Sequence, residues 1–211
     1  MSNFLTSSIG KKVIMSLSGL FLILFLCVHL SVNLLLLVSE EAFNAGCDFM
    51  ALPFIKVIEP VLALGFIVHI IWAIVLTIQN QKARPAKYAK RCQSQNCTWA
   101  SRNMYILGAL VLAFLVLHIA TVWYQFKFGE ITSHYEFVSS FLKQPCFGII
   151  YIIAAILLGL HITHGFWSAF QTIGFSNDIW RKRLECVAYF FAFVFAAGFS
   201  IIPLYFMIFG N

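Results

Sequence analysis

Five long apolar stretches decide what this chain can fold into. Each is about 25 residues long, and a helix needs about 20 mostly apolar residues to cross the hydrocarbon core of a bilayer. The stretches cover residues 14–38, 54–78, 103–126, 146–170 and 186–209. They are too long and too continuously apolar for the alternating strands of a β-barrel. We therefore predict an all-α fold, an integral membrane bundle of five transmembrane helices.

The composition leaves little room for a second domain. Of the 211 residues, 61% are hydrophobic and only 10% are charged, whereas soluble domains average about 45–50% apolar and about 25% charged residues. We expect a single transmembrane domain over residues 1–211, surrounded by membrane lipid. The first stretch is longer than the apolar region of a signal peptide and lacks a small-residue cleavage pattern, so we expect it to be retained.

The basic residues predict the orientation of the bundle. If the N-terminus lies in the cytoplasm, eleven of the fourteen Lys and Arg residues fall on the inner side and three on the outer side. By the positive-inside rule, we predict a cytoplasmic N-terminus and an external C-terminus. The net charge of +6 follows from this topology, and we expect no nucleic-acid partner. The polar, basic connection 79–102 is the longest inner loop and the expected docking surface for a protein partner.

Four histidines lie inside the first four stretches, one in each: His29, His69, His118 and His161. Ionisable groups inside a bilayer are costly and by default indicate a functional site. Each histidine stands fifteen residues from the start of its stretch. Because successive spans run in opposite directions, His29 and His118 share an outer level, while His69 and His161 share an inner level. The alternative is that each histidine is only a hydrogen-bonded contact between helices.

Two histidines that face each other across a helical bundle can ligate a haem iron. Such a haem has no open coordination position, so it carries electrons rather than binding substrate. A carboxylate-bridged di-iron site needs inward Glu-x-x-His patterns, which the spans lack. We therefore predict two b-type haems, one held by the iron ligands His29 and His118 and one by His69 and His161. Nearby glycines fit either close approach of a flat macrocycle or ordinary helix packing; they are Gly65, Gly159 and Gly165.

Two residues near the inner level are candidates for contacts around the haem. His164 lies three residues after His161 and nearer the inner surface. We assign it to a propionate, a water molecule or the 79–102 connection, outside the iron ligands. Arg102, among several basic residues at this edge, is the residue we choose as a propionate partner.

One acidic residue stands where a quinol could deliver protons. Glu59 opens the second span on the outer side, one turn from Lys56. It forms either a surface ion pair with that lysine or accepts a proton from a quinol oxidised beside the outer haem. Glu40 and Glu41 are rival acceptors on the same side.

Three segments carry a family resemblance. They are Ser8-Ile-Gly-Lys-Lys-Val-Ile-Met-Ser-Leu-Ser-Gly19 before His29, Ser101-Arg-Asn-Met104 before His118, and the run from His161-Ile-Thr-His-Gly165 to Gly174. With them the chain resembles the membrane-anchoring di-haem cytochrome b subunit of succinate dehydrogenase and quinol:fumarate reductase. It is most similar to the single-subunit, five-span type that works with menaquinone in bacteria, and the resemblance covers nearly the whole chain.

The resemblance implies an electron-transfer subunit in a bacterial cytoplasmic membrane. His29 and His118 would hold the distal haem, and His69 and His161 the proximal haem near an iron–sulfur subunit. Succinate and fumarate would react on a flavoprotein subunit that holds FAD, so no dicarboxylate site is expected on this chain. Electrons would pass between that subunit and menaquinone, in either direction, through the Fe–S clusters of the iron–sulfur subunit on the cytoplasmic face and through the two haems.

The chain departs from one family pattern, and other classes of protein compete. Some fumarate-reducing members have a glutamate two residues before the fourth-span ligand, where this chain has Gly159, so we expect no transmembrane proton route of that type. A haem b anchor of a formate dehydrogenase or hydrogenase would also use histidines inside its spans. A transporter or channel should show broken spans or polar rings, which we do not find. A purely structural anchor should bind no haem.

Overall fold

The computed structural model describes residues 7–82, 98–175 and 177–210, and within them it has helices and no strand. The five longest helical segments are each long and apolar enough to cross a membrane. They are built from α1 (Ser8–Leu34), α4 (Ile58–Lys82), α6 (Met104–His118), α9 (Pro145–Thr172) and α10 (Asp178–Phe209). The predicted all-α class and the five membrane-spanning helices are confirmed, and the chain is a multi-pass membrane protein.

Short turns extend three of these segments. A 3-10 turn, Leu35–Leu37, continues α1, and the one-turn helix α3, Pro53–Lys56, precedes α4. A single π-helical turn, Ile119–Trp123, follows α6 and leads into α7, Tyr124–Phe128. The Tyr124 amide donates to the carbonyl of Ile119, five residues back, as a π turn requires. Such turns occur mostly as single insertions in α-helices, often beside functional sites.

With these turns included, the five helical segments are longer than the apolar stretches that predicted them. The last helix begins at Asp178 rather than at residue 186, because the Asn177 side chain accepts a hydrogen bond from the Trp180 amide and caps its first turn. The second continues to Lys82 rather than ending at residue 78. Hydropathy marks only the apolar part of a helix, whereas the backbone hydrogen bonds continue through polar residues as far as the cap.

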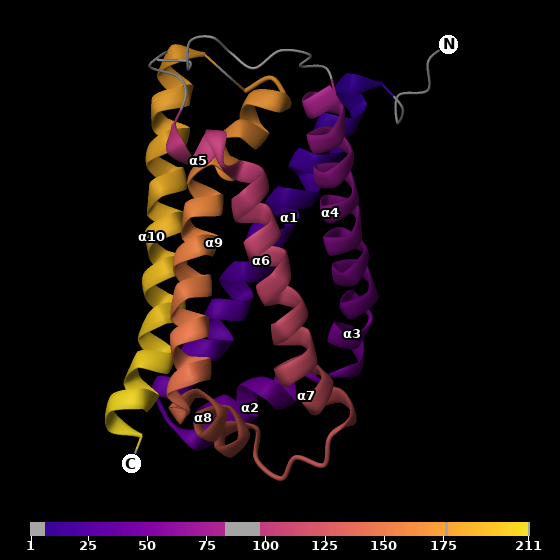
Figure 1. Ribbon diagram of the computed structural model, residues 1–211. Coiled ribbons are helices and arrows are strands. Elements are labelled where there is room, and N and C mark those ends of the chain that lie inside the picture. Colours follow the sequence, from indigo (N-terminus) through magenta and orange to yellow (C-terminus); the bar gives the residue numbers. More distant parts are fainter. Residues whose placement is uncertain (1–6, 83–97, 176, 211) are drawn as a thin grey trace.

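Two amphipathic helices, in segments where the apolar pattern predicts only connections, lie across one end of the bundle. They are α2 (Glu40–Met50) and α8 (His134–Lys143), and Figure 1 shows both beneath the long helices. Ser39 caps α2 and Ser133 caps α8. Glu136, three residues after Ser133, completes the Ser-x-x-Glu sequence of a capping box, a signal that could have predicted α8. The side-chain oxygen Oδ1 of Asn44 accepts a hydrogen bond from the Tyr135 backbone N–H at 3.0 Å and joins the two helices.

The long helices form a packed trio with two further helices beside it. Helices α9 and α10 run side by side, and α1 crosses them diagonally, packing against α4 near its own start (Figure 1). The apolar core between α1, α9 and α10 consists of Leu30, Ile162, Phe166, Trp167, Ala188, Ala192 and Phe195. Helix α6 packs on α9, and α4 packs on α1 without burying any of its own side chains.

Two of the glycines that we considered near the histidines belong to helix packing. A Cβ on Gly159 would lie 2.8 Å from the Ala192 carbonyl oxygen of α10, so this position admits no side chain. A Cβ on Gly65 would lie 2.8 Å from the Phe21 ring of α1. Both glycines bring helices together, which is the packing alternative of the sequence analysis.

Candidate functional site

The outer pair of histidines meets between α1 and α6. The ring centroids of His29 and His118 are 5.8 Å apart, and the ring planes cross at 80°. Aromatic rings from three helices surround the pair. Phe25 stacks on His29 and Phe114 on His118, while Phe199 of α10 lies 5.7 Å from His29. These rings line both faces of the pair, while the two histidines themselves are half-buried.

The inner pair of histidines meets between α4 and α9. The ring centroids of His69 and His161 are 6.4 Å apart, with the planes crossing at 74°. Two glycines lie against these rings. A Cβ on Gly19 would stand 3.2 Å from Cε1 of His69, and a Cβ on Gly108 would stand 3.6 Å from Cε1 of His161. The small residues that give the imidazoles space are therefore these two and not Gly65 or Gly159.

The separations within both pairs fit an iron between two imidazoles. A metal–imidazole bond is about 2 Å long and the nitrogen lies roughly 1 Å from the ring centre, so the two centroids should be about 6 Å apart. Within the described ranges, no three His, Cys, Asp or Glu residues gather as a metal site, so the histidines occur as pairs. Nδ1 of His161 is buried without a partner, a polar atom that a bound group or water would satisfy.

A hydroxyl group contacts one histidine of each pair. Neither of these two hydroxyl residues was among the site residues predicted from the sequence. The Tyr151 hydroxyl lies 3.1 Å from Nδ1 of His118, and the Ser18 hydroxyl lies 3.4 Å from Nδ1 of His69. Partners of this kind orient a metal-bound imidazole. Counting residues from the start of each span for hydroxyl side chains, as for the histidines, could have suggested Tyr151 as a partner of His118, because it stands near the start of its span.

His164 and Arg102, the residues expected near the inner pair, have separate contacts. His164 packs edge-on against Trp167 at 5.1 Å, and its Nδ1 is buried without a partner. The Arg181 guanidinium covers the same indole at 4.9 Å and pairs with Glu185. Arg102 is the exposed last residue of α5 (Trp99–Arg102), which packs on α9. Of the predicted docking connection 79–102, residues 83–97 lie outside the described residues.

The acidic residues considered as proton acceptors have separate partners. Glu59 forms an ion pair with Lys127 of α7, which joins the start of the second span to the end of the third, and not with Lys56 as the surface alternative supposed. Glu40 accepts a hydrogen bond from the Ser133 hydroxyl at 2.8 Å. Hydrogen bonds from its own backbone N–H and from Ser39 lower the pKa of Glu41. A lowered pKa makes that carboxylate a weaker proton acceptor.

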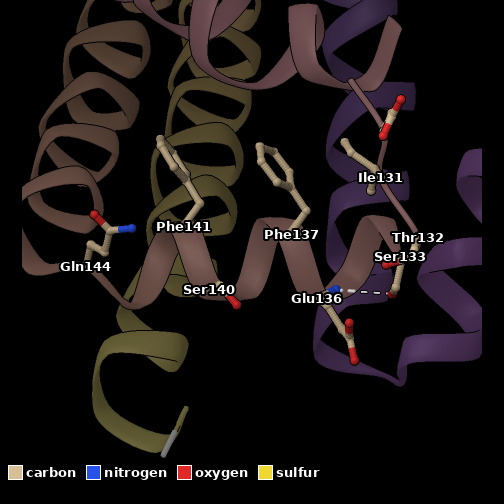
Figure 2. Close-up of a pocket in the computed structure, with 9 residues that line it drawn as sticks. Ile131, Thr132, Ser133, Glu136, Phe137, Ser140, Phe141 and Gln144 are labelled. Atoms are coloured by element: carbon tan, nitrogen blue, oxygen red, sulfur yellow. Dashed lines mark hydrogen bonds between the residues drawn. The ribbon is translucent and has the colours of Figure 1, made fainter. Parts of the chain in front are cut away.

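A hollow of about 400 Å³ lies along α8, at the end of the bundle where α2 and α8 lie across the long helices. It is lined by Glu130, Ile131, Thr132, Ser133, Glu136, Phe137, Ser140, Phe141 and Gln144. Figure 2 shows the rings of Phe137 and Phe141 on one side of α8 and the polar side chains of Ser140 and Glu136 on the other. Phe141 packs against Tyr151 at 5.6 Å, so the hollow is one aromatic ring away from the hydroxyl that contacts His118.

Comparisons with known proteins add no assignment. No family model, no curated protein and no solved structure matches this chain.

Proposed function

We propose that this chain is the membrane-anchor cytochrome b subunit of a succinate:menaquinone oxidoreductase of the succinate dehydrogenase and fumarate reductase class. The observation that carries the proposal is the spatial pairing of four histidines from four different spans. The pairs have ring separations of 5.8 and 6.4 Å, close to what a bis-imidazole iron requires. Four unrelated packing histidines have no physical reason to meet two by two in this way.

In this proposal the residues of the chain hold and insulate two b haems. His29 and His118 hold the distal one, and His69 and His161 the proximal one. A haem ligated by two imidazoles supplies reversible one-electron transfer without an open position for substrate. Phe25 and Phe114 stack on the imidazoles of the outer pair, and Gly19 and Gly108 leave room beside the inner pair. His164 and Arg102 are the proposed contacts around the proximal haem.

The proposed orientation follows from charge. The N-terminus lies in the cytoplasm of a bacterium and the C-terminus outside its inner membrane, because basic residues are concentrated at the ends that this orientation places inside. A flavoprotein with FAD and an iron–sulfur subunit dock on that face, and this chain contributes no dicarboxylate site. Menaquinone reacts at the outer end, with Glu59 as the proposed proton acceptor and the hollow along α8 as its approach to the distal level.

The proposal includes no proton route of the type that uses a glutamate on the fourth span. Gly159 occupies that position and faces α10, where a Cβ would already lie 2.9 Å from Cβ of Ala196. A carboxylate introduced there would need the two helices to separate.

The test is a pyridine haemochrome assay on the purified chain, combined with a dithionite-reduced minus oxidised spectrum. We expect two b-type haems per polypeptide. One haem would show that one of the pairs is not a ligand set. No haem in protein made under haem-replete conditions would exclude the electron-transfer function and favour a structural anchor or a transporter.

A second measurement identifies the enzyme that the anchor serves. In native membranes, we expect succinate to reduce the b haems and fumarate to reoxidise them. Reduction by formate or by hydrogen, and not by succinate, would assign the chain to a formate dehydrogenase or hydrogenase instead.

A further inference from the structure

The hydrogen bonds around His118 form a chain whose direction can be worked out. The Thr121 hydroxyl donates to the Leu117 carbonyl at 2.8 Å, which commits its only proton. The Tyr151 hydroxyl lies 3.5 Å from Thr121 Oγ1 and 3.1 Å from Nδ1 of His118. Because the proton of Thr121 is committed to Leu117, its oxygen can only accept a hydrogen bond from the Tyr151 hydroxyl.

This direction determines the proton on the histidine. A Tyr151 hydroxyl that donates its hydrogen bond to Thr121 has only oxygen lone pairs left for the imidazole, so it accepts a hydrogen bond from that ring. Nδ1 of His118 must then carry the hydrogen, and Nε2 is left with the free lone pair. A neutral imidazole has one N–H and one acceptor nitrogen, so the partner of one nitrogen selects the role of the other.

We propose that Tyr151, supported by Thr121, is a positioning residue that fixes the Nδ1–H tautomer of His118 and thereby presents Nε2 to the distal haem iron. The inference rests on the proposed function for its redox consequence, while the tautomer itself is a property of this chain alone. The π-helical turn Ile119–Trp123 begins directly after His118 and contains Thr121. It is the local feature that places this hydroxyl in the chain of hydrogen bonds.

The inner pair has a longer contact of the same kind, so the two pairs are not equivalent. The Ser18 hydroxyl donates to the Met15 carbonyl at 2.9 Å, so it too can only accept from Nδ1 of His69, at 3.4 Å. The bond at His118 is shorter and is backed by a second hydroxyl. Accepting a hydrogen bond from Nδ1–H raises the basicity of a ligating imidazole, and a more basic ligand stabilises ferric iron. Tyr151 should therefore lower the reduction potential of the distal haem.

The variant Tyr151→Phe removes the hydroxyl and keeps the ring that packs against Phe114 and Phe141. The matched control is Tyr189→Phe, on a residue of α10 whose side chain is 58% exposed and far from either pair in sequence and contacts. We expect Tyr151→Phe to raise the potential of one haem and change its low-spin EPR signal, leaving the other haem unchanged. The control should alter neither haem.

The tautomer is tested separately by ¹⁵N NMR of histidine-labelled full-length protein without haem. We expect His118, assigned by comparison with a His118→Gln sample, to show the Nδ1–H form, and Tyr151→Phe to shift it toward the Nε2–H form. An Nε2–H tautomer in the unchanged protein would overturn the inference whether or not haem binds. Two haems in the wild type with potentials unaffected by Tyr151→Phe would overturn its redox part and leave the proposed function standing. Absence of haem in the wild type would instead contradict the proposed function.

Discussion

A histidine inside a bilayer is tolerated only where its ring nitrogens have partners or a function, since an unsatisfied polar group in hydrocarbon costs several kcal/mol. The structure gives His69 and His118 hydroxyl partners and leaves Nδ1 of His161 buried without one. A purely structural role would predict partners on every ring. The orphaned nitrogen in a paired arrangement fits a site that binds a further group.

Replacing His69 or His161 with Ala is expected to remove the proximal haem while the chain still inserts in the membrane. The physical reason is that one imidazole cannot hold a low-spin b haem on both sides of the iron. Pyridine haemochrome should then give one haem per chain instead of two. His134→Ala is the matched control, because this histidine packs against Phe126 at the outer end and should leave both haems. Retention of two haems in either ligand variant would refute that ligand assignment.

The Cys47 thiol of α2 is expected to react slowly with alkylating reagents. Burial against the outer apolar cluster, with the Asp48 carboxylate beside it, raises its pKa to about 11 from the model-peptide value of 9.0. Between pH 9 and about 11 the Cys47 thiol of the folded protein therefore keeps its proton, whereas the thiol of the unfolded chain loses it. Because the folded state binds more protons, the contribution of Cys47 to the free energy of unfolding falls as the pH rises through this range.

The measurement is the rate of alkylation by N-ethylmaleimide at pH 9 in a variant that retains only Cys47. The thiolate is the reactive form, and its fraction should be about fifty-fold lower than in the SDS-unfolded protein. A variant that retains only Cys146, whose side chain is exposed, controls for access of the reagent. Equal rates for Cys47 in folded and unfolded protein would contradict the expectation.

At the scale of elements, close contact between α9 and α10 depends on small residues. The core that they share with α1 contains Ala188 and Ala192, which are buried, and Gly159 faces the backbone of α10. Small residues let helices approach closely where no water drives association, which is the rule inside membranes. The same small residue at position 159 excludes the acidic side chain that a proton route would need.

Gly159→Ala is expected to destabilise the bundle by about 1–3 kcal/mol, the usual cost of forcing an extra group into a packed interface. Gly165→Ala is the matched control on the same helix, since its Cβ would meet only Met104 Cε at 3.5 Å, an ordinary contact. The control should be neutral or slightly stabilising, because Ala is a better helix former than Gly by about 1 kcal/mol. The denaturation midpoint of each variant in detergent, compared with that of the wild type, tests both expectations. A midpoint of Gly159→Ala equal to that of the wild type would show that α9 and α10 adjust to the added methyl group.

For the whole molecule, the odd number of spans places the start of α1 and the end of α10 at opposite ends of the bundle (Figure 1). Which end is cytoplasmic is an inference from the basic residues alone. Lys182 and Arg183 stand exposed near the start of α10, at the end proposed to be inside, whereas Cys146 stands at the start of α9, at the other end.

Labelling with a membrane-impermeant maleimide tests this orientation. In a cysteine-free background, we expect restored Cys146 to be labelled on intact spheroplasts. We expect Lys182→Cys to be labelled only after the membrane is opened, because its site faces the cytoplasm. The reverse pattern would invert the topology and, with it, the face on which the iron–sulfur subunit is proposed to dock.

The sequence by itself determined the fold class and the number of spans. An apolar run of about 20 residues or more that enters hydrocarbon must satisfy its backbone hydrogen bonds internally, and the helix does this within one segment. The sequence also predicted which histidines would meet, because helix direction and depth follow from counting residues along alternating spans. Helix ends differed from the apolar edges, since caps such as Asn177 and Ser133 act through side-chain hydrogen bonds that hydropathy does not measure.

Only the tertiary structure decided which side chains surround each pair. Depth does not fix the rotation of a helix about its axis, and that rotation turned Gly65 and Gly159 toward helix packing and Gly19 and Gly108 toward the histidine rings. It also paired Glu59 with Lys127, which is distant in sequence, and brought Tyr151 of α9 to His118 of α6. Rotation and partner choice depend on how every neighbouring helix packs, so no single stretch of sequence contains them.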